Sequence, residues 1–206
     1  MKFKPSYTSS IAEDIMAERL IRAQAVEFLA DAPMRLKSGL ISPVYVDNRK
    51  LFSHPEAWRD IVETMASRVE EYDLEFDIVA GVEAAGSMHA AALAYRLGLP
   101  AIMVRQKAKT YGNHSRIEGG DVKGMRVLLL EDHISTGLSC LDAIRALRGE
   151  GAQVTQVMSI TNYAIPETQR LFKQEGIDTY DVIAFEKVVR KAKEMGVIDD
   201  EHEKLV

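Results

Sequence analysis

The sequence predicts an α/β fold in which helices cover both faces of a central, mainly parallel sheet. Segments of strand length that are rich in apolar residues occupy residues 76–80, 101–104, 127–130 and 154–160, and segments with helical periodicity separate them. This alternation is typical of a parallel sheet, because each return to the same edge needs a long crossover connection. The run at 127–130 is apolar throughout, as in a strand that is buried on both faces.

Three further elements are expected before the first of these strands. Apolar residues recur at roughly helical spacing over residues 10–29 and predict one helix there. Residues 34–47 predict two short strands joined by a glycine-containing turn at 37–39. A second helix is expected over residues 55–69, because the segment begins with proline, which suits the first helical turn.

The rest of the chain alternates as the sheet requires, with one exception. Helices are expected at residues 87–97, 141–148, 167–174 and 185–195, with a short one near Asp200. Residues 105–124 are polar and charged, with little apolar periodicity. So long a structureless stretch inside a compact domain indicates either a missed element or a functional lid, and we favour the lid.

The composition is that of a globular protein. With 206 residues, 47% hydrophobic and 28% charged, the chain is long enough to bury a core, so residues 1–206 are expected to form a single domain. The sequence has no long apolar stretch and no apolar N-terminal segment, which predicts a cytoplasmic protein without a membrane span. A net charge of −5 disfavours a nucleic-acid-binding surface. The single cysteine, Cys140, is expected to pack in the core.

Residues 126–139 carry the strongest functional motif. The acids Glu131 and Asp132 follow the apolar run and precede a turn that opens a helix. Ligands bind beyond the carboxyl ends of strands in open α/β sheets, and a helix start offers backbone N–H groups to a phosphate. The turn residues are Ser135, Thr136, Gly137, Leu138 and Ser139. Acids beside a phosphate cradle suit a ribose 5-phosphate, although acidic pairs at strand ends are common and a Ser before a helix is often only a cap.

This fourteen-residue pattern resembles the PRPP-binding motif of the type I phosphoribosyltransferases. Residues 37–56, 80–86, 104–119 and 176–198 are similar, in order and spacing, to one branch of that family, the orotate phosphoribosyltransferases. The resemblance extends over roughly residues 9–198. It implies the type I phosphoribosyltransferase fold, with a core of about residues 55–175 and a small hood. The hood is formed by about residues 1–50 together with the C-terminal segment.

The resemblance implies an enzyme, a pentosyltransferase of pyrimidine nucleotide biosynthesis. It transfers ribose 5-phosphate from PRPP to orotate and yields orotidine 5′-monophosphate and pyrophosphate. Mg²⁺ is the implied cofactor and is held mainly by the substrate rather than by protein ligands. A homodimer is implied, in which a mobile loop of residues 105–120 closes over the neighbouring subunit. No nucleic acid and no membrane are expected as partners.

The resemblance also assigns roles to individual residues. Asp132 and Glu131 face the ribose diol, and residues 135–139 hold the 5-phosphate. The remaining implied sites are the cationic catalytic residues Arg105, Lys107 and Lys109, the pyrophosphate loop of Val82, Glu83, Ala84, Ala85 and Gly86, and the base-binding residues Lys37, Tyr45 and Ser135. Without the resemblance, a solvated loop is the favoured interpretation of the three cations, whereas Lys37 is equally consistent with a surface turn.

The chain departs from the family pattern inside these motifs. Tyr111 replaces the usual loop histidine, and Glu83 lies where members have small hydroxylated residues. An acid near the pyrophosphate weakens binding unless it turns away. Leu138 places bulk beside the phosphate cradle, and His133 either adds positive charge or points to solvent.

Some members carry an arginine after the strand at 154–160, which grips the orotate carboxylate, whereas this chain has Thr161, Asn162 and Tyr163. Two alternatives therefore stay open beside the orotate enzyme. One is a paralogue that uses another base, and the other is a non-catalytic protein that binds PRPP or a nucleotide. A DNA-binding regulator built on this fold is expected to carry an added basic domain, and the sequence contains no such domain.

Overall fold

The structure, a computed structural model, describes residues 9–29, 32–35, 39, 41–108 and 115–205. The backbone divides into two compact units. Unit 1 comprises Met1–Ile61 and Ile183–Val206, and unit 2 comprises Val62–Val182. No helix in the described part of the chain is long and apolar enough to cross a membrane.

Unit 2 is built on a six-stranded sheet with the order β10-β9-β8-β5-β6-β7. All neighbouring strands pair in parallel except β6 and β7, which are antiparallel. The predicted mainly parallel sheet is therefore confirmed. The strands are β5 (Ile78–Val82), β6 (Ala101–Val104), β7 (Ile117–Glu118), β8 (Arg126–Ile134), β9 (Gln153–Asn162) and β10 (Asp178–Asp181).

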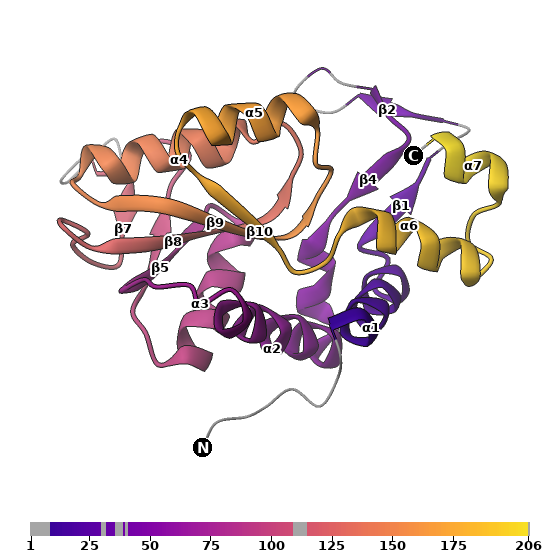
Figure 1. Cartoon of the computed structure of the whole chain (residues 1–206), viewed down its shortest axis with the longest axis horizontal. Helices are drawn as coiled ribbons and strands as arrows, with labels where there is room; N and C mark the ends of the chain where they lie inside the picture. Colours follow the sequence, from indigo (N-terminus) through magenta and orange to yellow (C-terminus); the bar gives the residue numbers. More distant parts are fainter. Residues whose placement is uncertain (1–8, 30–31, 36–38, 40, 109–114, 206) are drawn as a thin grey trace. The chain divides into compact units, whose positions relative to one another are not determined.

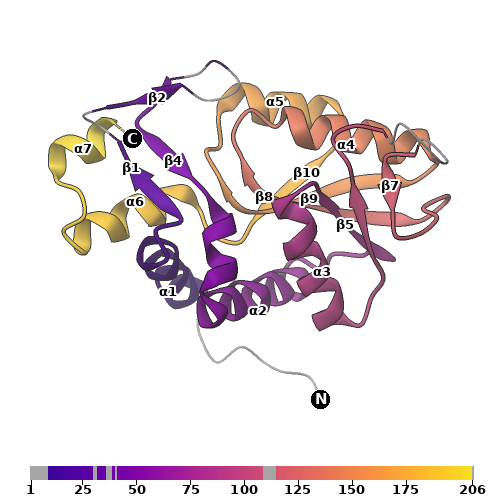
Figure 2. The same ribbon diagram turned by 180° about the vertical axis from the view of Figure 1, so that it is seen from behind.

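Helices cover both faces of this sheet (Figures 1 and 2). Helix α3 (Ala85–Leu97) lies on one face, and α4 (Leu138–Gly149) and α5 (Pro166–Gln174) lie on the other. The core beneath α4 and α5 is apolar and fully buried, with Leu129, Ile144 and Phe172 at 2% exposure or less. The α/β architecture and the predicted helices at 87–97, 141–148 and 167–174 are confirmed, each helix beginning one to three residues early.

Unit 1 combines two small antiparallel sheets with helices. β1 (Val26–Phe28) pairs with β4 (Val44–Val46), and β2 (Met34–Arg35) pairs with β3 (Ile41–Ser42). Lys37, in the predicted turn between these strands, lies outside the described residues. The helices of this unit are α1 (Ser9–Arg22), the 3-10 helix η1 (Asn48–Ser53), the first part of α2 (Pro55–Glu71), α6 (Phe185–Glu194) and α7 (Asp200–Leu205).

The single helix predicted over residues 10–29 is wrong in its last third. Helix α1 ends at Arg22, and Gln24 takes a left-handed backbone with φ of 54° that redirects the chain. Residues 26–28, Val-Glu-Phe, then form β1, because β-branched and aromatic side chains suit a strand that has a partner in β4. The periodicity of residues 10–29 contains no information about this partner strand, which lies eighteen residues later in the chain.

Besides β1, the strands β7 and β10 were not predicted. β7 lies inside the stretch 105–124 that was expected to be structureless, and it pairs with β6. β10 has the polar sequence Asp-Thr-Tyr-Asp, which lacks the apolar pattern that predicts a strand. It forms the edge of the sheet beside β9. Edge strands tolerate polar residues because one of their sides faces no neighbouring strand.

Candidate functional site

The predicted site lies at the carboxyl end of β8, but the acids do not end this strand as expected. β8 continues through Glu131 and Asp132 to Ile134, because β9 is long enough to pair with it along this length. The first turn of α3 approaches the same place closely. A Cβ on Gly86 would lie 2.6 Å from the Leu130 carbonyl oxygen and 3.3 Å from Glu131 Oε1. Glycine is therefore required at position 86, and it brings residues 82–86 beside the acid pair.

The turn between β8 and α4 is held by contacts from two directions. Gly137 caps the helix with φ of 71°, a conformation that favours glycine. Thr168 of α5 donates its hydroxyl to the Ser135 carbonyl oxygen at 3.1 Å, and Ser139 donates its hydroxyl to Glu131 Oε2 at 3.2 Å. The structure thus brings residues 82–86, 131–132 and 135–139 to one end of the sheet.

The start of α4 has the character of an anion site. No side chain among the described residues caps this helix, whose first backbone N–H groups have no partner within the helix itself. Such N–H groups and the positive end of the helix dipole together favour a phosphate. Leu138 is 60% exposed, so its side chain extends toward solvent and does not fill the turn as its bulk had suggested.

The two adjacent acids differ in environment. Glu131 is only 6% exposed. Burial raises the pKa of its carboxyl well above the ordinary value, and the charge of Asp132 and a hydrogen bond to it raise that pKa further. Asp132 is half-buried, and its backbone N–H donates to Glu131 Oε1 at 3.3 Å. The surroundings of Glu131 therefore favour the protonated form of its carboxyl more than water does.

Cys140 is buried as predicted and lies beneath this pair. Its thiol contacts Glu131 Oε2 at 3.8 Å. Burial raises the pKa of the thiol well above its ordinary value, and the neighbouring acids raise it further. The thiol is therefore protonated and serves as a packing group, because only a thiolate is strongly nucleophilic.

His133 neither points to solvent nor adds positive charge, contrary to both expectations. Its Nδ1 lies 2.9 Å from Thr161 Oγ1, and its ring packs edge-on against Tyr163 with 4.2 Å between centroids. Nε2 is shielded from solvent without a hydrogen-bond partner among the described residues. Burial lowers the pKa of this histidine to about 4, so the ring is neutral at pH 7.

His133 should make the protein less stable in mild acid. The pKa is about 4 in the folded state and about 6.5 in the unfolded state, so below about pH 6.5 the unfolded chain binds more protons and stability falls. Between about pH 7.5 and pH 5 the loss is at most about 2 kcal/mol, or roughly 4–8 °C in Tm. We expect the Tm of the His133→Leu variant to fall less than the Tm of the native protein over this pH range. Equal losses in thermal melts would contradict the buried neutral state.

The predicted cationic residues differ in how they are held. Arg105 donates from Nη1 to Glu118 Oε1 at 2.8 Å, so its charge is paired in this structure. Lys107 is exposed. Glu83 turns toward the segment after β6, where its carboxylate accepts the Gln106 backbone N–H at 3.0 Å. Residues 109–114 of the predicted loop, among them Lys109 and Tyr111, lie outside the described residues.

Tyr45, a predicted base-binding residue, belongs to unit 1. It lies in β4 with a half-buried side chain, and Arg49 Nη2 lies 3.4 Å from its hydroxyl oxygen. Arg49 also donates to Asp47 through Nε and Nη2. This contact orients the phenol within unit 1.

Buried polar residues on β9 and β10 were not predicted as part of any site. Ser159 is fully buried and donates its hydroxyl to Asp181 Oδ1 at 2.6 Å. Burial raises the pKa of the Asp181 carboxyl, and the Ser159 hydrogen bond opposes that rise. Ser159 is in register with Glu131 on the neighbouring strand. In the sequence, Ser159 stands among the apolar residues Met158 and Ile160 of the predicted strand 154–160.

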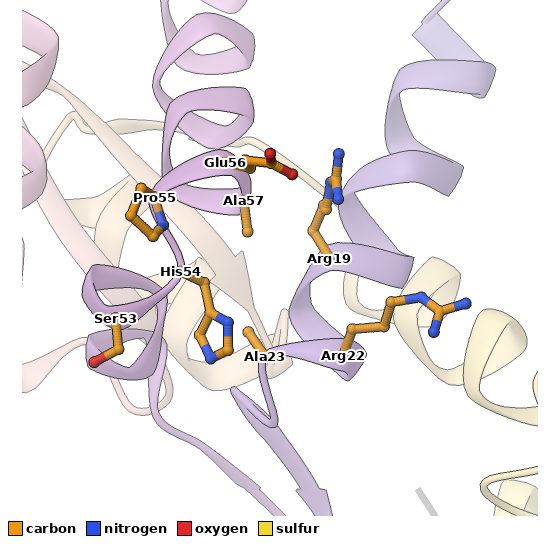
Figure 3. A pocket seen from close by; sticks show the side chains of 8 residues that line it. All are labelled: Arg19, Arg22, Ala23, Ser53, His54, Pro55, Glu56 and Ala57. Carbon is orange, nitrogen blue, oxygen red and sulfur yellow. The ribbon is translucent and has the colours of Figure 1, made fainter.

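A pocket of about 500 Å³ lies in unit 1 and contains no predicted site residue (Figure 3). Its arginines are compensated by acids, because Arg19 Nε donates to Asp60 and Arg22 Nε to Glu18 at 2.9 and 2.7 Å. The candidate site therefore remains the strand ends of unit 2. The pocket is lined by Arg19, Arg22, Ala23, Ser53, His54, Pro55, Glu56 and Ala57.

Comparison with known proteins shows to which family the chain is similar. Residues 47–195 match the phosphoribosyl transferase domain family. The chain is 42% identical to the orotate phosphoribosyltransferase of Coxiella burnetii over 185 residues, which are 90% of this chain and 88% of that protein. The crystal structure of orotate phosphoribosyltransferase from Aeropyrum pernix superposes with a TM-score of 0.75 at 28% identity, covering 89% and 99% of the two chains. The Mycobacterium tuberculosis enzyme in complex with PRPP gives a TM-score of 0.67 at 26% identity, over 86% and 98%.

Proposed function

This chain belongs to the phosphoribosyl transferase domain family and, within it, to the orotate phosphoribosyltransferases, and we propose that it transfers ribose 5-phosphate from PRPP to orotate. The products are orotidine 5′-monophosphate and pyrophosphate, so the reaction belongs to pyrimidine nucleotide biosynthesis. The observation that carries this proposal is the uncapped start of α4 beside one buried and one half-buried acid. The phosphate of a ribose 5-phosphate binds at the helix start, and the two neutral hydroxyls at the other side of the ribose bind the acids.

The residues have distinct tasks in this proposal. The turn at residues 135–139 binds the 5-phosphate through backbone N–H groups and hydroxyls. Asp132, the more accessible of the two acids, accepts from the ribose hydroxyls and stabilises positive charge that develops on the ribose. Glu131 holds the strand end and the turn together through Ser139. Arg105, Lys107 and Lys109 supply positive charge to the departing pyrophosphate.

Mg²⁺ is the cofactor we propose, bound mainly through the substrate. No group of three His, Cys, Asp or Glu side chains suited to a metal occurs among the described residues. The donors at the strand ends are carboxylate and hydroxyl oxygens, which suit Mg²⁺, and this ion keeps several non-protein ligands. The Asp132 carboxylate is the protein group best suited to it, because Asp132 is half-buried whereas Glu131 is buried. When bound, the ion neutralises charge on the pyrophosphate.

Unit 1 is proposed to act as the hood, with Lys37 and Tyr45 facing the base. We further propose a homodimer in which the loop of residues 105–120 closes over the neighbouring active site and excludes water. Light scattering gives the mass of the assembly. Mixing two inactive variants, one altered at Lys109 and the other at Asp132, tests the sharing of a site, because a shared site restores part of the activity in mixed dimers.

Pyrophosphate release from PRPP and Mg²⁺ tests the proposed function directly. We expect release that depends on orotate and is absent with uracil, adenine or no base. Release with another base alone would move the specificity and keep the mechanism. No release with any base, together with measurable PRPP binding, would make the protein a binding protein and overturn the enzyme proposal.

A further inference from the structure

Glu83 contacts the end of β6 and the segment after it with all three of its hydrogen-bonding groups. Its backbone N–H donates to the Val104 carbonyl oxygen at 2.9 Å and thereby extends the pairing of β5 with β6. Its carbonyl oxygen accepts from the Gln106 side-chain amide at 3.1 Å, and its carboxylate accepts the Gln106 backbone N–H at 3.0 Å. One residue of the loop at 82–86 thus holds one residue at the start of the loop that follows β6.

The same segment is held from its other side by the chain around β7. Arg105 donates its backbone N–H to the Arg116 carbonyl oxygen at 2.8 Å, and Arg116 Nε donates to the Arg105 carbonyl oxygen at 2.7 Å. The Arg105 guanidinium bonds to Glu118. Residues 105 and 106 are therefore fixed between two neighbours. Lys107 is the first residue beyond them, and its side chain is exposed.

We propose that Glu83 is a positioning residue that couples the pyrophosphate loop, residues 82–86, to the start of the predicted mobile loop at residues 105–107. It thereby determines the direction that the chain takes from the end of β6 to Lys107. This role rests on the proposed function, in which both loops meet the pyrophosphate. The positioning role explains why an acid can occupy position 83, where a carboxylate without a hydrogen-bond partner would repel the pyrophosphate. Because the Glu83 carboxylate accepts the Gln106 backbone N–H, the carboxylate faces the segment after β6 and Gln106 determines its position.

The alternative is that Glu83 acts only through its charge. A repelling carboxylate weakens PRPP binding, so Glu83→Ala and Glu83→Gln would both lower KM for PRPP to a similar extent and leave kcat unchanged. A positioning carboxylate gives another pattern. Glu83→Ala removes the acceptor for the Gln106 N–H, whereas Glu83→Gln retains an amide oxygen that accepts it more weakly.

The test compares Glu83→Ala, Glu83→Gln and Gln106→Ala with the surface variant Glu70→Ala as control. For Glu83→Ala we expect kcat to fall about tenfold with KM for PRPP changed by less than about threefold, as for loss of one charge-assisted hydrogen bond near the reacting group. Glu83→Gln should show a smaller loss, about threefold. Gln106→Ala should also lose about threefold, because it removes one of the two bonds to residue 106.

Hydrogen exchange of the Gln106 backbone amide, followed by NMR, gives a readout without turnover. We expect exchange at least about tenfold faster in Glu83→Ala than in the native protein or in Glu70→Ala. Unchanged exchange, native kcat in Glu83→Ala, or an equal fall of KM in both Glu83 variants would each overturn the coupling role. Failure of the native protein to release pyrophosphate would refute the proposed function instead, while the exchange measurement still decides whether Glu83 holds the loop.

Discussion

Replacing Asp132 with Asn should lower kcat/KM for PRPP on the order of 100-fold and leave the fold intact. The substitution retains the size of the side chain and removes the charge that accepts from the ribose hydroxyls. Hydrogen bonds to a charged group contribute about 1.5–3 kcal/mol, which corresponds to losses of roughly 10- to 150-fold. The side chain is half-buried, so we expect Tm to change by less than about 2 °C.

The measurement is steady-state pyrophosphate release with PRPP and orotate varied separately. Asp178→Asn serves as the matched control, because Asp178 is an exposed aspartate on the edge strand β10. This control should retain native kinetics. If Asp132→Asn kept full activity, the ribose would lie elsewhere and the proposed site would be wrong.

Replacing Glu131 with Gln should stabilise the protein, and the gain should grow as pH rises. The pKa of Glu131 is raised in the folded state, so its contribution to stability is complete below the unfolded pKa, near 4.3, and is lost as pH rises toward the folded value. A glutamine does not ionise and escapes this loss. We expect the variant to have the higher Tm at neutral pH, by more than about 2 °C, and a Tm similar to the native one near pH 4.

Thermal melts from about pH 4 to pH 8 measure this difference, and the same variant is then assayed. We expect its loss of kcat/KM to be at least about tenfold smaller than that of Asp132→Asn, because Glu131 is buried and acts through Ser139 rather than on the ribose. A constant Tm difference across the pH range would mean that Glu131 ionises normally in the folded protein. Equal activity losses in the two variants would contradict the division of tasks between the two acids.

The sequence predicted most of the architecture because the residue pattern that predicts a strand or a helix extends over only a few neighbouring residues. The all-apolar run at 127–130 and the turn chemistry at 135–139 are local, and both were located correctly. The errors have one cause. Residues 26–28 and the strands β7 and β10 become extended because a partner strand is present, and periodicity carries no record of a partner.

The candidate site divides in the same way. By itself, the sequence determined that an acid pair and a phosphate-binding turn adjoin, since both lie within nine residues of one another. Only the tertiary structure decided that Glu131 is the buried member with a raised pKa, that His133 is neutral, and that Glu83 faces Gln106. These properties arise from desolvation and from hydrogen bonds to residues distant in the chain, and both come into being only when the strands and helices pack together.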